Sequence, residues 1–444
     1  MKQLLSVIHC EMLRVVFAAL QLAAATGSAG VDVFKWEGTS HYDLGFQMGV
    51  FAAPHIRARL AQPIYYKWLV PWATTSVEGV KVYDDFLRAH VAAYPDYIDE
   101  ILGMAEGANV TFAELFVINT KLALTYFAPA GPGSWQRGQR VDQCTDYFLR
   151  RNEDSANVTV LAHNEDAGNG DAGHTFIAHV RFRGDTQSPS WSAFVSAGAL
   201  PTGGFGWNSN GLAFTLNYVA PLSGAVRGGI ARAFVGRDML EARDFDDLKR
   251  RVLLSDSLVG SSAGHNHQLL DCSVRPPRAV GIETGPGHLS ASTVLHSRYA
   301  HENLYLYLDV AQAKDPGSDA RAARIAQLPP ARDASEVLEI LSDAANRRFP
   351  IFHAAANTRD ETGLRTLATV SFDAERCVAS KLLPLYFIRN PSHNVTRSGA
   401  PKHICYVPQH TKRCVATLWS GVEPAGAAPT HTFRIEGCKR AEGE

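Results

Sequence analysis

The chain of 444 residues lacks an excess of charge of either sign, because 43 lysines and arginines stand against 44 aspartates and glutamates. The net charge of −1 gives no electrostatic attraction to nucleic acid, so we expect a small molecule as the partner. The chain also lacks an apolar run long enough to cross a bilayer, since the run within residues 13–26 is too short. Hydrophobic residues still make up 46% of the sequence, which predicts a large core and excludes a disordered protein.

Common metal and cofactor motifs are missing as well. His265, His267 and Asp271 could be taken for metal ligands, but no HExxH or CxxC pattern accompanies them. The glycine-rich segment 203–206 has no following lysine and precedes a predicted strand, which argues against a phosphate-binding loop. The Gly, Ser and Trp that bracket a papain-type nucleophile are absent around Cys144. We therefore predict no metal and no cofactor.

The first 29 residues have the features of a secretory signal peptide. Lys2 precedes the apolar stretch 13–20, and the small residues 27–29 follow it as a cleavage site. Three Asn-x-Thr glycosylation acceptors agree with passage through the secretory pathway: Asn109, Asn157 and Asn394. We expect a secreted or lumenal protein. Arg14 lies inside the apolar stretch, which leaves open a buried helix or a mis-assigned start. The protein would then be cytoplasmic.

Seven cysteines are present, of which Cys10 would leave with the signal peptide and Cys144 is assigned to chemistry below. The others are Cys272, Cys377, Cys405, Cys414 and Cys438. Three of these fall in the last forty residues, 405–444, where a secreted chain would use disulfides to hold a segment with little core. The pairing cannot be deduced and one cysteine must remain odd. Reduced thiols of a cytosolic protein are the alternative.

Residues 43–124 have mostly helical apolar spacing, with apolar positions recurring at intervals of three and four. Thr111, followed three positions later by Glu114, predicts a helix start of the capping-box type. Glycines and prolines then concentrate in 128–140 and predict an exposed linker that leads to Cys144.

After Cys144 the period of the apolar pattern changes to two and predicts consecutive strands. They are expected at 145–149, 157–162, 175–182, 191–196, 212–216, 267–272, 278–283, 367–372 and 378–383. One helix is expected over 230–254, with Arg232, Arg237 and Glu241 on polar faces, and another over 334–346. Strands, then helices, then strands indicate an α+β fold with two sheets packed face to face and helices outside. We find no internal repeat.

Cys144, which follows Gln143 and precedes Thr145, suits an enzyme whose own N-terminal residue is its nucleophile. Once the bond before Cys144 is cut, the thiol can attack a carbonyl while the α-amine of the same residue accepts its proton. Their ordinary pKa values, about 8.5 for the thiol and about 7.7 to 8.0 for the amine, make that transfer inexpensive near neutral pH. The cut itself would pass through a thioester at Gln143. A buried cysteine beside a strand former is the structural alternative.

Seven segments in this order resemble the acyl-coenzyme A:6-aminopenicillanic-acid acyltransferase family, which includes the arthropod N-β-alanyldopamine hydrolase Tan. They are HYDLGFQMG at 41–49, PDYIDEILGMAEGA at 95–108, CT at 144–145, HNED at 163–166, WNSNGL at 207–212, SSA at 261–263 and TLATV at 366–370. Gln143 departs from the glycine expected before the family's nucleophile. The resemblance implies a four-layer αββα N-terminal-nucleophile hydrolase sandwich.

The resemblance also implies site residues. Asp166 matches the aspartate that contacts the freed amine, and Asn266 matches the asparagine that stabilises the oxyanion. A strand-end cap is the alternative for Asp166. Other candidates for the oxyanion site or the pocket are Asn217, Tyr218, Ser262 and His163.

The domains expected are a signal peptide (1–29), a helical pro-segment (30–143), a catalytic domain (144–395) and a C-terminal extension (396–444). We expect a proenzyme that cuts itself between Gln143 and Cys144, after which the two fragments stay together as a heterodimer. The mature protein would hydrolyse a small N-acyl or β-alanyl amine, such as N-β-alanyldopamine or β-alanyl-histamine, through an acyl-cysteine intermediate. An acyltransferase that uses an amine acceptor, or an inactive secreted glycoprotein of the same fold, are the alternatives.

Overall fold

The computed structural model describes residues 32–130, 142–153, 156–184, 187–222, 224–312, 314–355, 357–375, 378–383, 414–420 and 429–435. The predicted signal peptide, the acceptor Asn394, and Cys10, Cys377, Cys405 and Cys438 lie outside the described residues. No helix in the described ranges is both long enough and apolar enough to cross a membrane.

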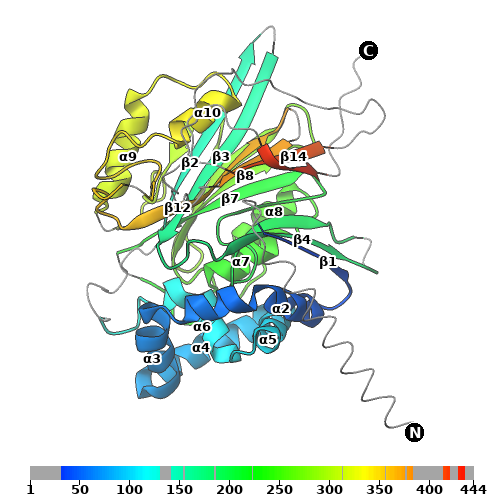
Figure 1. Ribbon diagram of the computed structural model, residues 1–444, viewed down its shortest axis with the longest axis vertical. Helices are drawn as coiled ribbons and strands as arrows, with labels where there is room; N and C mark the ends of the chain where they lie inside the picture. The colour runs from blue at the N-terminus through cyan, green and yellow to red at the C-terminus, as the bar shows by residue number, and fades with distance from the viewer. Residues whose placement is uncertain are drawn as a thin grey trace, which may run out of the picture. The chain divides into compact units, whose positions relative to one another are not determined.

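The segment 41–124 is helical, as the apolar spacing of residues 43–124 predicts (Figure 1). Its elements are α2 (His41–Leu60), the π-helix η1 (Ile64–Leu69), α3 (Val70–Thr75), α4 (Val77–Ala93), α5 (Pro95–Ala108) and α6 (Phe112–Leu124). Thr111 caps α6 and accepts from the backbone of Glu114, whose side chain accepts from the backbone of Thr111 in return, so the predicted capping box is confirmed.

Helices α2 and α5 approach each other at backbone distance. A Cβ atom at Gly45 of α2 would lie 2.0 Å from the carbonyl oxygen of Glu100, and one at Gly103 of α5 would lie 2.0 Å from that of Tyr42. Only glycine fits where two helix backbones touch. Both glycines belong to segments that carry the family resemblance, so those two segments serve helix packing.

Two sheets follow in the described residues, with the order β1-β4-β5-β6-β7-β8-β9-β10 in the first, called sheet A, and β11-β2-β3-β12-β13-β14-β15 in the second, called sheet B. Sheet A consists of β1 (Val33–Gly38), β4 (Thr175–Phe182), β5 (Trp191–Ser196), β6 (Phe205–Asn208), β7 (Leu212–Val219), β8 (Gly264–Asp271), β9 (Arg278–Thr284) and β10 (Ser290–Val294). Sheet B consists of β2 (Asp142–Glu153), β3 (Ala156–Gly168), β11 (Tyr299–His301), β12 (Leu364–Asp373), β13 (Val378–Leu383), β14 (Cys414–Ser420) and β15 (Pro429–Ile435). The predicted C-terminal extension thus adds β14 and β15 to sheet B.

Three apolar clusters show which way the strand faces point, because side chains alternate along a strand. The first joins helices α2 to α8 to one face of sheet A, for example through Leu216 and Leu269. The second lies between the sheets and includes Phe148 of β2 and Leu270 of β8. The third packs the other face of sheet B against α9 (Pro316–Gln327) and α10 (Ala334–Leu341), for example through Tyr147. The fold is therefore mixed α+β.

The single helix expected over 230–254 is wrong. Two short helices stand there, α7 (Arg232–Met239) and α8 (Phe245–Val252), because Asp244 caps a new helix start with its side chain. The expectation that Arg237 lies on a polar face is wrong too. Arg237 is fully buried, and its guanidinium forms an ion pair with the buried Glu100 at 2.6 Å and with Glu241 at 2.8 Å.

Candidate active site

The thiol of Cys144 is fully buried between the two sheets, near the start of β2. It shares a strand face with Asp146 and Phe148, and Phe148 belongs to the cluster between the sheets. In the antiparallel pair of β2 and β3, Cys144 lies directly opposite Glu165, and Asp146 lies opposite His163. The four polar side chains therefore meet on one face of sheet B.

These four side chains form a continuous chain of hydrogen bonds. The Cys144 Sγ donates to Glu165 Oε2 at 3.4 Å, His163 Nε2 lies 3.1 Å from the same oxygen, and His163 Nδ1 lies 2.8 Å from Asp146 Oδ1. All four residues are buried. His163, which the sequence suggested for the pocket, is thus placed beside the thiol.

Burial and charge change the pKa values within this chain. Burial, followed by the carboxylate of Glu165, raises the pKa of Cys144 to about 11. Burial opposes a charge on His163, but the Asp146 carboxylate and hydrogen bonds to Asp146, Cys144 and Glu165 outweigh it, so the pKa of His163 lies well above its usual value. The imidazole is therefore protonated and bridges two carboxylates, while the thiol holds its proton firmly.

Cys144, His163 and Glu165 also form a set of potential metal ligands, because their sulfur, nitrogen and oxygen atoms lie within 4.8 Å of one another. The two histidines considered as metal ligands from the sequence lie in sheet A. His265 and His267 lie on one face of β8 as their spacing predicts, with ring centroids 5.9 Å apart, whereas Asp271 forms an ion pair with Arg278.

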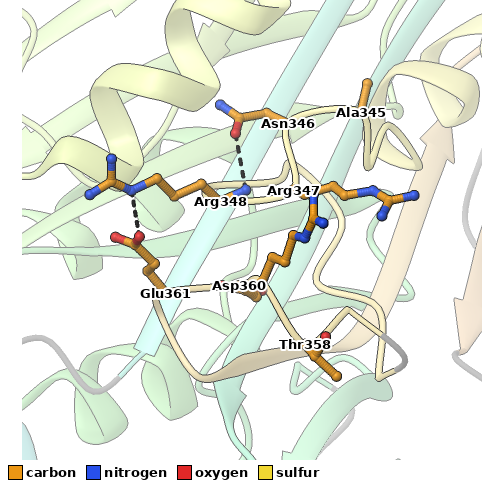
Figure 2. A pocket seen from close by; sticks show the side chains of 8 residues that line it. Ala345, Asn346, Arg347, Arg348, Thr358, Asp360 and Glu361 are labelled. Atoms are coloured by element: carbon orange, nitrogen blue, oxygen red, sulfur yellow. Dashed lines mark hydrogen bonds and ion pairs between the residues drawn. The ribbon is translucent and has the colours of Figure 1, made fainter.

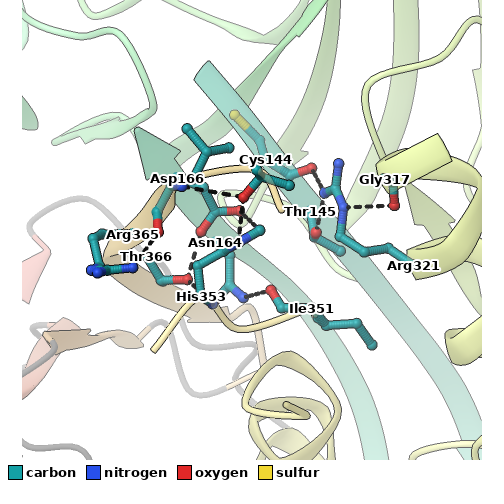
Figure 3. Close-up of polar contacts among 12 residues, drawn as sticks. Cys144, Thr145, Asn164, Asp166, Gly317, Arg321, Ile351, His353, Arg365 and Thr366 are labelled. Atoms are coloured by element: carbon teal, nitrogen blue, oxygen red, sulfur yellow. Dashed lines mark hydrogen bonds and ion pairs between the residues drawn. The ribbon is translucent and has the colours of Figure 1, made fainter. Parts of the chain in front are cut away.

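The backbone of Cys144 is held from the side of α9. The amide N–H of Cys144 donates to Asn303 Oδ1 at 3.0 Å, and Arg321 of α9 donates to the same oxygen at 2.8 Å. Arg321 also donates to the carbonyl oxygen of Cys144 and to the hydroxyl of Thr145 (Figure 3). The nitrogen of Cys144 is therefore fixed by an acceptor that an arginine orients.

Asp166 lies on the opposite face of β3 from Glu165, since neighbouring side chains alternate. Its Oδ1 accepts from the Thr366 hydroxyl at 2.6 Å, and its Oδ2 lies 3.7 Å from His353 Nε2 (Figure 3). Burial raises the pKa of Asp166, although His353 and Arg321 attract the carboxylate. Asp166 pairs with Gln143 in the β2–β3 register, and its side chain points to the α9 and α10 side.

The other residues suggested by the sequence fall into two groups. Asn266 lies between the sheets, and its Nδ2 is 3.4 Å from Asp146 Oδ2. Asn217 faces the same space and donates to the carbonyl oxygens of His301 and Glu302.

Tyr218 and Ser262 belong to the second group. The Tyr218 hydroxyl lies 2.8 Å from that of Tyr126, so its ring points to the helical side of sheet A. Ser262 is buried in the loop before β8, where its backbone bonds to Ile230 and Val226.

Arg232 of α7 approaches the chain of hydrogen bonds from sheet A. Its Nη2 lies 4.0 Å from Glu165 Oε2 and donates to the carbonyl oxygens of Leu216 and Gly203. The backbone of Gly204 lies close to the carboxylate and leaves no room for a side chain, because a Cβ there would lie 2.7 Å from Glu165 Oε2. Arginine and glycine together confine Glu165 to its position at the thiol.

An open pocket of about 770 Å³ lies elsewhere, on the loop between α10 and β12 (Figure 2). Its lining includes Arg347, Arg348 and Asp360. Asp360 Oδ2 lies 2.7 Å from His353 Nδ1, and His353 approaches Asp166. The pocket therefore borders the outer side of sheet B, not the thiol of Cys144.

Sequence reasoning missed five residues that surround Cys144: Asp146, Glu165, Arg232, Asn303 and Arg321. Two of them could have been found. Asp146 is two positions after Cys144 on the same strand, and Glu165 is the third residue of the HNED segment. The other three come from α7, α9 and the turn after β11, and no motif marks them.

Two comparisons with known proteins give the class, which is amide hydrolases and acyltransferases. Residues 151–383 match the sequence model of the family described as acyl-coenzyme A:6-aminopenicillanic acid acyl-transferase, a match that starts after Cys144. The chain is also 24% identical over 392 residues to a beta-alanyl-dopamine/carcinine hydrolase of Drosophila melanogaster, across 84% of this chain and 96% of that protein. The protein belongs to the acyl-coenzyme A:6-aminopenicillanic acid acyl-transferase family, as its sequence segments predicted.

Proposed function

We propose that the protein is a proenzyme that cuts itself between Gln143 and Cys144 and then hydrolyses small amides with Cys144 as the N-terminal nucleophile. The observation that carries this proposal is the buried Cys144 thiol, placed between two sheets with its backbone nitrogen held by Asn303. After the cut, the α-amine would remain at the oxygen of Asn303 and take the proton of the thiol. The packing of helices, sheet A, sheet B, and α9 with α10 supports the four-layer αββα sandwich.

Asp166 and Asn266 keep the roles that the resemblance implies as part of this proposal. Asp166 lies opposite Gln143, so the new chain end would form beside its carboxylate, which can attract the amine. Asn266 lies between the sheets next to Asp146 and can donate to an oxyanion there.

The substrate we propose is a β-alanyl amine such as N-β-alanyldopamine or β-alanyl-histamine. The hydrolase relative from Drosophila melanogaster is named for such substrates. The carboxylate of Asp146, on the same strand face as the thiol, supports this choice, because it would attract the ammonium group of a β-alanyl substrate. Transfer of the acyl group to an amine is the second candidate, since the family is described as an acyl-transferase.

The two fragments would remain associated, because β1 pairs with β4 in sheet A and so joins the segment before the cut to the segment after it. We also propose a secreted or lumenal location. The side chains of Asn109 and Asn157 are exposed, as glycosylation acceptors must be.

Denaturing mass analysis of the purified full chain tests the self-cleavage, and the expected result is two fragments of which the larger begins at Cys144. Incubation with β-alanyl-histamine should then release free β-alanine. If a new amide accumulates when a second amine is supplied, the acyltransferase candidate holds instead. An intact chain that still turns over substrate would contradict the N-terminal-nucleophile mechanism.

A further inference from the structure

Self-cleavage before Cys144 poses a chemical problem that the mature enzyme does not have. In the continuous chain the nitrogen of Cys144 is an amide, which cannot accept a proton from the thiol. The thiol is also a poor nucleophile there, because burial, followed by the carboxylate of Glu165, raises its pKa to about 11. The first cut therefore needs another base.

Glu165 is placed for that task. Its Oε2 accepts the hydrogen bond of the Cys144 thiol at 3.4 Å, and the two residues are direct partners in the β2–β3 register. Glu165 is 7% exposed, so bulk water has little access to the pair. The amide of Cys144 is bonded to Asn303, on the side of α9, which leaves the thiol side to Glu165.

His163 and Asp146 keep this carboxylate in position. His163 Nε2 lies 3.1 Å from Glu165 Oε2 and its Nδ1 lies 2.8 Å from Asp146 Oδ1, so the imidazolium joins two carboxylates. The contact with His163 thus fixes the same Glu165 oxygen that accepts from the Cys144 thiol. These two residues act through Glu165 and are positioning residues.

We propose that Glu165 is the catalytic base of the self-cleavage step, held by His163 and Asp146, and that the α-amine of Cys144 takes over this role once the cut is made. This inference rests on the proposed self-cleavage and assigns the group that starts it. The structure thus gives the continuous chain and the mature enzyme two different bases for one sulfur atom.

The step balances as follows. The Cys144 thiol gives its proton to Glu165, and the sulfur forms a bond to the carbonyl carbon of Gln143. The carbon–nitrogen bond between Gln143 and Cys144 then breaks, and the leaving nitrogen takes the proton from Glu165, which gives a thioester and a free α-amine. Water adds to the thioester carbon, so Gln143 ends as a carboxylate and the sulfur regains a proton.

The test is Glu165→Gln in the full chain, with the rate of appearance of the fragment that begins at Cys144 measured by denaturing mass analysis. We expect that rate to fall by about 10²-fold or more, the usual contribution of a general base. Glu165→Asp keeps the carboxylate and should restore part of the rate, which shows that loss of the base, and not misfolding, is the cause. Glu302→Gln is the matched control. Glu302 is also buried, so the control makes the same replacement at a second buried carboxyl group.

A second measurement separates the base from other roles. Turnover of β-alanyl-histamine is expressed per molecule that already carries the free N-terminal Cys144, and it should change by less than about tenfold in Glu165→Gln. Normal processing of Glu165→Gln, or an equal loss of processing and of turnover per processed molecule, would overturn the proposal. Processing that stops when EDTA is added would also overturn it, and would assign the cluster to a metal. If the wild-type chain is never cut, the proposed function itself fails.

Discussion

Gly204→Ala tests whether the position of the Glu165 carboxylate matters, because the added methyl group points at that carboxylate. The new Cβ would lie 2.7 Å from Glu165 Oε2, whereas ordinary contact begins at 3.4 Å. Gly204 does not have a positive φ, so alanine causes no backbone strain there. The carboxylate must therefore move by the difference, 3.4 − 2.7 = 0.7 Å.

The effect of this displacement can be estimated. A misplacement of about 1 Å can cost about 10²-fold in rate, so we expect self-cleavage to slow by about tenfold to a hundredfold. Crowding a packed site costs about 1–3 kcal/mol of stability, which a large fold tolerates. The loss should therefore appear in the rate of cutting, while the chain stays folded.

The assay follows the fraction of full-length chain cut at Cys144 over time, with the melting temperature measured in parallel. Gly203→Ala is the matched control, because a Cβ there meets no atom within 4 Å, and it should be cut at the wild-type rate. Equal rates for both variants and the wild type would refute the reasoning that the position of the carboxylate limits the cut.

Three further predictions concern the nucleophile and buried ion pairs. Cys144→Ala should give an uncut chain by mass analysis and no release of β-alanine. Asp146→Asn should lower the pKa of His163. The raised pKa of His163 stabilises the fold below about pH 6.5, and this stabilisation is lost as the pH rises through the pKa of the folded state. Urea unfolding should therefore show a larger loss of stability in Asp146→Asn at about pH 6 than at about pH 10. Arg237→Met removes the guanidinium from the buried Glu100, which still pairs with His41. It should cost about 3–5 kcal/mol in urea unfolding, part of which Glu100→Gln should recover.

The sequence predicted most of the fold, because apolar period and caps are local signals. The strands expected at 175–182 and 191–196 coincide with β4 and β5, and Thr111 starts α6 as expected. The long helix over 230–254 failed because Asp244 caps a second helix start and because the buried Arg237 was taken for a surface residue. Strand β1 was missed, since its partner β4 lies far along the chain.

The site was predicted in part. Strand alternation after Cys144 would have given Asp146, and the HNED segment contains both His163 and Glu165. Asn303 and Arg321 could not be predicted, because they reach Cys144 across 159 and 177 residues and no local pattern records that contact.

In some of the segments that carry the family resemblance, side chains donate hydrogen bonds to backbone carbonyl oxygens of the same chain. The Asn208 side chain donates to the carbonyl oxygens of Leu240 and Ala242, and the Ser261 hydroxyl donates to that of Ala263. These residues hold loops in place.

The backbone contact between α2 and α5 bears on any saturation mutagenesis of this protein. At Gly45 and Gly103 even a methyl group would force two helix axes apart, so every replacement should reduce the yield of folded protein. In a screen that scores product alone, these positions would be as intolerant as the nucleophile. Dividing activity by the amount of soluble protein would separate the two kinds of intolerance.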